Sequence, residues 1–342
     1  MADRYQIFRE LDHATHDAGL ALSRGRQPWM FDRAAWFELA AKHTLEGKPL
    51  IIKGEAGDDK CWLFLNQNGH CAHALSNWYC LRYGVVSEGE NPPLDQLVRG
   101  LRKSGVSHLR IDPTAREEQF IAQLHRRGWL TRLEQIDVSW RAKTAGMSFD
   151  EYWAARPSRL RNTIKRKDKK VALDCHIYKH FDAGLWAQVY DVFENSWKPA
   201  DGIPDLTFDL FRQEAEAGTL RVGLAMHDGR PVAAQLWTIE HGTAIIHLLS
   251  YREDAKSLSA GSILSREMFR HALDQEHVDM IDFGIGDHGY KRDWMDHCVP
   301  LYSLTAYHAF SAAGIAGIVG MVGRKIGNVV QNAFPDASRT NR

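Results

Sequence analysis

The chain has 342 residues, of which 44% are hydrophobic and 25% charged, as is typical of a globular protein with enough apolar residues for two domains. Lys plus Arg and Asp plus Glu balance at 43 each, so the charge gives no reason to expect DNA as a partner. The five cysteines include no CxxC pair, and residues 1–25 lack the apolar core of a secretory signal. We therefore expect reduced thiols, no metal site and a cytoplasmic protein.

The first half predicts helices and strands that alternate with turns rich in Gly, Asp and Asn. Helices are expected at residues 31–45, 93–103 and 117–127. Strands are expected at residues 50–53, 61–65, 79–86, 106–111 and 131–140.

The second half repeats this order, and it begins with a long helix over residues 149–170 that Pro157 is expected to kink. Further helices are expected at residues 183–197, 207–217, 261–275 and 290–298. Strands are expected at residues 173–178, 220–226, 232–240, 243–251, 278–283 and 301–307. Short turns at Gly229 and Gly242 join three of these strands, which predicts that they are antiparallel neighbours.

This order of elements predicts an α+β fold of two tandem units, each a mixed, mainly antiparallel sheet flanked by helices. The boundary is expected near residues 144–146, which gives an N-terminal unit over 1–145, a C-terminal unit over 146–308 and a tail over 309–342.

The segment from Asp282 to Trp294 is the strongest candidate for a site. Three glycines follow the end of an expected strand, and Tyr290 and Lys291 come directly after them. Glycine permits backbone dihedrals that a Cβ forbids and lets a ligand approach the backbone closely. A turn that leads into a helix is the alternative interpretation. Nothing before residue 145 has this pattern, so we expect the second unit to bind the ligand and the first to be degenerate and catalytically silent.

Several short motifs follow one another along the second half of the chain. They are Phe149–Trp153, Ser158–Asn162, His247–Tyr251, Ser259–Gly261, and Asp282–Gly286 with Tyr290 and Lys291. In these motifs, residues 148–307 resemble the GNAT acetyltransferase fold, in the branch that pairs two such units. The likeness is to the CelD-like acetyltransferase-domain proteins and, more distantly, to the FemAB peptidyltransferases. The first half resembles the branch in the order of its elements only, and the resemblance therefore implies two GNAT-like units.

The resemblance implies acyl-coenzyme A, with an acetyl or longer acyl group, as the donor, and no metal. The pyrophosphate is expected at the start of the helix after the central strand, and the pantetheine arm in a cleft where two strands part. The expected cofactor-binding residues are Ser250, Tyr251, Ser259 as the N-cap, Gly261, Ser262, Phe283, Gly284 and Gly286. Residues 256–261 depart from the Gln/Arg-x-x-Gly-x-Gly/Ala signature of the superfamily, and an ordinary capped helix is the alternative there.

Acyl transfer to an amine needs a base for the amine and an acid for the leaving thiolate. The resemblance implies Tyr290 as the acid. Asp282, Asp287 and His247 are the candidates for the base, although Asp282 could instead cap a helix and His247 could be structural. Lys291 is expected to stabilise an oxyanion or bind a substrate carboxylate, with a solvated surface lysine as the alternative.

The expected helix from Ser158 to Lys170 carries seven basic residues against Asp168 alone. Such a helix could bind phosphates, anionic lipid headgroups or tRNA, or it could simply be solvated. The expected substrate-binding residues are Arg159, Arg161, Asp287 and Trp294.

The tail begins with an apolar stretch over residues 309–323, followed by Arg324 and Lys325. This stretch is shorter than the roughly 20 residues that span a membrane. Its glycines recur every three or four residues, which predicts a helix docked on the domain or on the second subunit of a homodimer. Peripheral contact with the inner face of a membrane is the alternative.

Together these features favour an N- or O-acyltransferase that acts on a small or envelope-related acceptor, in cell-envelope or polysaccharide metabolism. A FemAB-like peptidyltransferase that uses aminoacyl-tRNA and a non-catalytic scaffold in polysaccharide assembly are the alternatives. No charged coiled-coil insertion of the kind expected in the FemAB family is seen between residues 145 and 309.

Overall fold

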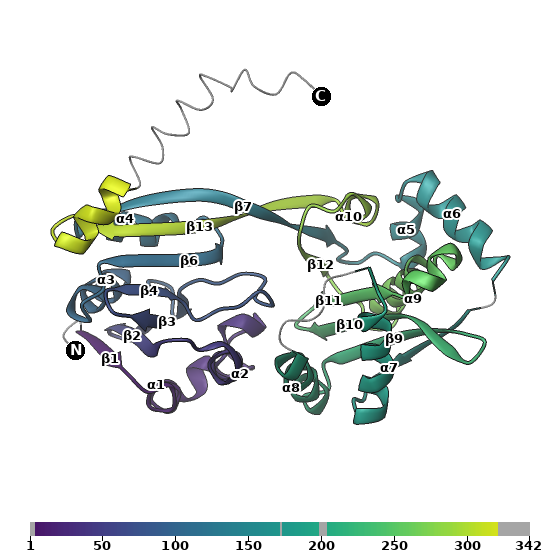
Figure 1. Cartoon of the computed structure of the whole chain (residues 1–342), viewed down its shortest axis with the longest axis horizontal. Coiled ribbons are helices and arrows are strands. Elements are labelled where there is room, and N and C mark those ends of the chain that lie inside the picture. Colours follow the sequence, from purple (N-terminus) through teal and green to yellow (C-terminus); the bar gives the residue numbers. More distant parts are fainter. Residues whose placement is uncertain (1–3, 172, 198–203, 321–342) are drawn as a thin grey trace, which may run out of the picture. The chain divides into compact units, whose positions relative to one another are not determined.

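The computed structural model describes residues 4–171, 173–197 and 204–320, which form two compact units (Figure 1). The first unit comprises Met1–Ile136 with Leu301–Arg342, and the second comprises Asp137–Pro300. The divisions fall inside two long strands, β7 (Trp129–Lys143) and β13 (His297–His308), whereas the sequence places the boundaries at residues 145 and 308.

The first unit is a mixed sheet with helices packed on it, and its strands are paired in the order β1-β2-β3-β4-β6-β13. The strands before β7 are β1 (Arg4–Phe8), β2 (Lys48–Ala56), β3 (Asp59–Asn68), β4 (Cys71–Ala74), β5 (Val86–Glu88) and β6 (His108–Thr114). The helices are α1 (Leu11–Ala18), α2 (Ala34–Thr44), α3 (Leu94–Lys103) and α4 (Glu118–Arg126).

The second unit has the strand order β7-β12-β11-β10-β9-β8. Its further strands are β8 (Asp174–Tyr178), β9 (Leu220–His227), β10 (Arg230–Glu240), β11 (Thr243–Tyr251) and β12 (Met280–Ile285). Its helices are α5 (Phe149–Ala154), α6 (Ser158–Asp168), α7 (Ala183–Glu194), α8 (Pro204–Glu216), α9 (Ala260–Asp274) and α10 (Gly289–Trp294).

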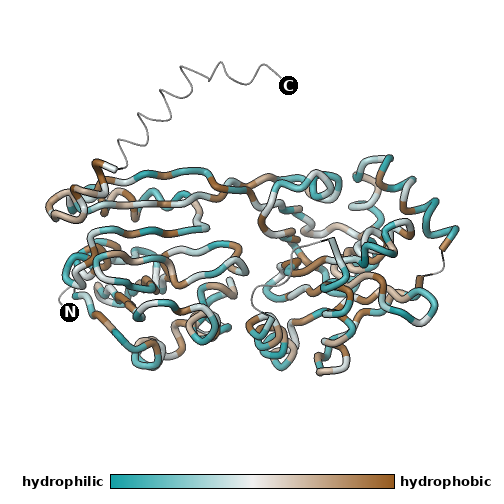
Figure 2. The backbone as a smooth tube through the Cα atoms, viewed as in Figure 1, coloured by the Kyte–Doolittle hydropathy of each residue, from teal (hydrophilic) through white to brown (hydrophobic). Residues whose placement is uncertain are grey.

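The core of the second unit lies between its sheet and α9. Along β10 and β11 the side chains alternate between two faces, and the face with Trp237 and Ile246 packs on Leu264 and Phe269 of α9. The Trp237 ring meets Phe269 edge-on, with ring centroids 5.2 Å apart. Apolar residues recur along these strands, whereas α6 is largely hydrophilic (Figure 2). Burial of this face therefore fixes the register of the strands that lead to the site.

The α+β fold with two units is confirmed, and the turns at Gly229 and Gly242 join antiparallel neighbours as expected. Some local predictions are wrong. Residues 79–86 form no strand apart from Val86, and the sequence analysis missed β1, α1 and β4. The helix expected over 149–170 is two helices, because Pro157 occupies the N-cap position of α6 in an extended conformation.

The last strand expected in each half extends into the other unit. Residues 139–143 of β7 pair with β12, and residues 302–307 of β13 pair with β6. At 15 residues β7 is long enough to contribute to both units, which a local pattern of apolar residues does not reveal.

Residues 312–320 are helical, and Ile315 and Val319 on this helix are exposed. The rest of the predicted tail, including Gly323, Arg324 and Lys325, lies outside the described residues. In the part of the chain that the structure describes, no helix has both the length and the apolar character needed to cross a bilayer.

Candidate active site

A cavity of about 320 Å³ lies in the second unit, between the end of β11, the start of α9 and α10. The residues that line it are Leu160, Trp197, Leu249, Tyr251, Lys256, Ser259, Gly261, Ser262, Ser265, Phe283, Tyr290, Asp293 and Trp294. It therefore brings together seven of the residues that the sequence predicted: Tyr251, Ser259, Gly261, Ser262, Phe283, Tyr290 and Trp294.

The cavity lies where two parallel strands part. β11 and β12 pair only from Thr243 to Ile245 and from Met280 to Asp282. Beyond these residues β11 has N–H and C=O groups that do not pair with β12, and a ligand can bond to them. The parting that the sequence predicted is thus present, and Tyr251 and Phe283 lie beyond it, on the lining of the cavity.

One end of the cavity is formed by the first turn of α9. Ser259 occupies the N-cap position with a φ of 57°, and its side chain makes no capping hydrogen bond. The expected capping role of its hydroxyl is therefore wrong, because the left-handed backbone does not have the extended geometry of a capping residue. A Cβ on Gly261 would lie 3.2 Å from Cδ1 of Tyr251, so glycine keeps this end of the cavity open.

Tyr290 lies on α10 with 37% of its surface exposed. Its ring packs on Phe283 at 5.7 Å and on His288 at 5.8 Å between centroids. Burial, and secondarily the nearby Tyr251, raises the pKa of the Tyr290 phenol to about 12. The phenol therefore keeps its proton at neutral pH, as a general acid must.

Asp282 is fully buried and lies outside the cavity lining. Its carboxylate accepts hydrogen bonds from Ser139 Oγ, from Arg141 Nε and from the Gly284 N–H, each at 2.8 Å. These bonds hold the end of β12 against β7. The Asp282 carboxylate thus holds the strand end in place, and the geometry does not bring it to a substrate as a base.

Lys291 is also buried, and its ammonium donates hydrogen bonds to the carbonyls of Gly284 at 3.1 Å and Ile285 at 2.7 Å. Gly284 and Gly286 have φ values of 70° and 112°, in the region that favours glycine. Here the β12 register shifts between Asp282 and Ile285, which marks a bulge. None of these three residues lines the cavity, so they shape the strand end that presents Phe283 and Tyr290.

His247 lies on the other side of the sheet. Leu236 pairs with Leu248 and Trp237 with Ile246, so His247 is the extra residue of a bulge in β11. Its Nε2 lies 2.8 Å from the Thr238 hydroxyl, and its ring contacts Phe211 of α8. Burial lowers the pKa of the imidazole to about 4. The structure thus does not bring His247 to the cavity.

The remaining predicted residues do not line the cavity. Ser250 of β11 is buried and does not line the cavity. Asp287 forms an exposed ion pair with Arg292 at 2.6 Å. Arg159 contacts the lining residue Asp293 at 3.0 Å, whereas Arg161 lines a different cavity.

The sequence analysis missed several lining residues. Ser265 follows Gly261 by one helical turn and Leu249 precedes Tyr251 by two strand positions, so both could have been inferred from the period of their element. Asp293, the one carboxylate among the described lining residues, lies one helical turn beyond Tyr290 and could have been found in the same way. Trp197 has no local signal, because it comes from the segment after α7.

Three comparisons relate this geometry to known proteins. Residues 158–292 match the family model described as an acetyltransferase (GNAT) domain. The predicted GNAT resemblance is thereby confirmed, and the matched segment lies within the second unit. No curated protein matches the chain.

Solved structures show the same fold at low sequence identity. The C-terminal domain (DUF2156) of a proposed lysylphosphatidylglycerol synthetase from Agrobacterium fabrum is 13% identical, with a TM-score of 0.58 over 92% of this chain and 96% of that one. FemX is 10% identical, with a TM-score of 0.55 over 79% of this chain and 94% of that one. L-PGS from Bacillus licheniformis is 13% identical, with a TM-score of 0.52 over 80% and 90%. These likenesses extend over both units and concern the fold alone.

Proposed function

We propose that the cavity of the second unit is the active site of an acyltransferase that moves an acyl group from acyl-coenzyme A to an amine or hydroxyl acceptor. The observation that carries this proposal is the position of the Tyr290 phenol in a cavity at the parting of β11 and β12, inside the segment that matches the GNAT domain.

The lining of the cavity fits such a donor. The first turn of α9 forms a polar end whose backbone N–H groups suit phosphate groups, and Lys256 beside it pairs with Glu253 at 2.8 Å. Leu249, Phe283 and Trp294 form an apolar part suited to an acyl chain. The backbone of β11 beyond its pairing with β12 can bond the amides of a pantetheine arm.

Acyl-coenzyme A supplies a thioester whose carbonyl carbon is open to attack. The acceptor nitrogen or oxygen forms a bond to this carbon, and the C–S bond breaks. Tyr290 donates its proton to the departing sulfur, and a carboxylate takes the proton of the acceptor. We propose Asp293 for the carboxylate, because it lines the cavity one helical turn from Tyr290.

For the acceptor we propose a small or envelope-related molecule, as the named activities of the structural neighbours suggest. Whether the acceptor group is an amine or a hydroxyl stays open. A cytoplasmic location, with peripheral contact at the inner face of a membrane or a homodimer through the tail, also stays a prediction.

Calorimetric titration of the protein with acetyl-coenzyme A tests the proposal. We expect saturable binding of one molecule per chain and, with a panel of amines and alcohols, release of free coenzyme A. If acetyl-coenzyme A does not bind at millimolar concentration, the donor assignment is wrong. Transfer from aminoacyl-tRNA would then support the FemAB-like alternative. If the protein uses neither donor, the result would support the non-catalytic scaffold.

A further inference from the structure

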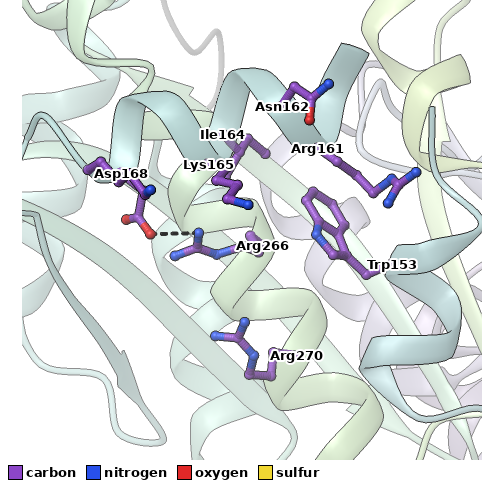
Figure 3. Close-up of a pocket in the computed structure, with 9 residues that line it drawn as sticks. Trp153, Arg161, Asn162, Ile164, Lys165, Asp168, Arg266 and Arg270 are labelled. Carbon is purple, nitrogen blue, oxygen red and sulfur yellow. Dashed lines mark hydrogen bonds and ion pairs between the residues drawn. The ribbon is translucent and has the colours of Figure 1, made fainter. Parts of the chain in front are cut away.

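A second cavity, of about 350 Å³, lies between α6 and α9 of the same unit (Figure 3). Its lining residues are Trp153, Arg161, Asn162, Ile164, Lys165, Asp168, Lys169, Arg266 and Arg270. None of them lines the candidate active site, so this is a separate cavity.

The lining is strongly positive, since it holds five cationic side chains and one carboxylate. Two of the cations are neutralised within the protein. Arg266 contacts Asp168 at 2.8 Å and Glu267 at 2.7 Å, and Arg270 contacts Glu267 at 2.6 Å. Lys165 and Lys169 are exposed and make no ion pair with the described residues, and Arg161 uses only its Nε, toward the Arg156 carbonyl at 3.0 Å.

The walls of the cavity are tied together before any ligand binds. The Arg266–Asp168 pair joins α9 to the end of α6, as the dashed line in Figure 3 shows. Lys167 donates a hydrogen bond to the Ser257 carbonyl at 2.7 Å, which holds α6 to the segment before α9. Ile164 is buried and anchors the middle of α6. Burial opposes the charge of Arg266, yet its hydrogen bonds to Asp168 and Glu267 raise its pKa, so it stays charged.

We infer that this cavity binds a phosphate group of a ligand. Arg161 and Lys165 extend from α6 toward the space beside Trp153 (Figure 3), and Asn162 is a further lining residue. Guanidinium groups, ammonium groups and amides are the donors that bind phosphate oxygens, and cations left unpaired in one concave site favour a multiply charged anion. The phosphate can belong to a soluble phosphate ester or to the headgroup of a lipid. The inference is independent of the donor proposed for the active site.

Titration with inorganic phosphate, followed calorimetrically on the full chain, tests the inference with a matched pair of double variants. Lys165→Gln with Lys169→Gln removes two lining cations. Arg166→Gln with Lys170→Gln removes two cations of the same segment that do not line the cavity. We expect saturable binding that the first pair weakens about tenfold or more, whereas the second pair changes it by less than about twofold.

Equal weakening by both pairs would overturn the inference, since α6 would then act as a general charged surface of the kind that binds RNA. No saturable binding to the wild-type protein would overturn it as well. The same variants should bind acetyl-coenzyme A as the wild type does, which separates this inference from the proposed function.

Vesicles separate the two sources of the phosphate. The protein is sedimented with phosphatidylglycerol vesicles and, for comparison, with phosphatidylcholine vesicles. If it sediments only with phosphatidylglycerol, and only the first double variant loses this binding, the cavity binds a lipid headgroup. Binding of inorganic phosphate without sedimentation of the protein would assign it to a soluble phosphate ester.

Discussion

At the scale of single residues, Tyr290 and Asp282 have different surroundings although both belong to the same glycine-rich segment. The Tyr290 phenol lies on the lining of the cavity, whereas the Asp282 carboxylate is fully buried and accepts three hydrogen bonds from the protein. The first arrangement leaves a donor for a ligand, and the second satisfies a buried charge. We therefore assign chemistry to Tyr290 and support of the strand end to Asp282.

Tyr290→Phe should lower kcat by about 10²–10⁴ and leave the affinity for acetyl-coenzyme A nearly unchanged, because the ring stays and only the proton donor is lost. Because the pKa of the Tyr290 phenol is raised to about 12, the phenol keeps its proton up to about pH 10. Deprotonation of Tyr290 should therefore not lower the wild-type rate below that pH. Steady-state kinetics with an identified acceptor measure both. An unchanged kcat with weaker binding would make Tyr290 a positioning residue.

Asp282→Asn should lower the free energy of unfolding by about 2–3 kcal/mol, because Arg141 loses its buried partner and the amide cannot accept all three hydrogen bonds. Urea unfolding measures this change. Asp287→Asn is the matched control, since it removes an exposed carboxylate of the same segment and should leave the unfolding midpoint unchanged. Equal midpoints for both variants would show that Asp282 does not stabilise the strand end.

His247 gives a prediction about pH. Its folded pKa of about 4 lies below the ordinary value of 6.5, so the unfolded chain takes up a proton first as the pH falls. Stability should therefore decrease below about pH 6.5, and this residue should account for a loss of about 2 kcal/mol between pH 7.5 and 5. His247→Gln should remove that part of the loss in urea unfolding. An identical pH dependence in the variant and the wild type would contradict the buried neutral state.

At the scale of elements, the bulges of β11 and β12 decide which side chains reach the cavity. In a regular strand His247, Leu249 and Tyr251 would share one face, but the extra residue in β11 puts His247 on the α8 side and leaves the other two on the α9 side. The bulge in β12 includes the left-handed Gly284 and lies just before α10, which carries Tyr290. The strands part next to both irregularities.

Gly261→Val tests the contribution of α9. Its Cβ would lie 3.2 Å from Tyr251, and the branched side chain would occupy the end of the cavity suited to phosphates. We expect the affinity for acetyl-coenzyme A to fall by at least about tenfold, or 1.4 kcal/mol, in a protein that remains folded. Gly289→Val is the control, because a Cβ at Gly289 meets open space. Equal affinities of the two variants would place the donor elsewhere.

The elements that could be predicted from the sequence are those whose patterns lie within a short stretch of the chain. Period and turn chemistry were enough for α9, β10 and β11, and glycine density with the family resemblance led to Phe283 and Tyr290. The place of His247 depends on a single-residue bulge, which an alternating pattern does not contain. The contribution of Trp197 depends on the tertiary course of the chain after α7.

At the scale of the whole molecule, the two units share an order of strands but differ in the features that a site requires. β4 and β6 of the first unit pair in parallel, as β11 and β12 do in the second. The first unit lacks a glycine-rich segment with a Tyr-Lys pair after β6, where the chain reads Ala115-Arg116-Glu117. The extension of β7 and β13 into both units was not predictable, because both strands have ordinary sequence patterns and only their pairing is unusual. We therefore expect the second unit alone to bind the donor.

Amide hydrogen exchange of the full chain, with and without acetyl-coenzyme A, tests this claim most directly, because it locates the ligand without requiring a known acceptor. The account predicts slower exchange at the end of β11, in the first turns of α9 and from β12 through α10, that is in residues 246–264 and 280–294. It predicts no change in residues 48–114. Protection confined to the first unit, or no protection at millimolar acetyl-coenzyme A, would contradict it.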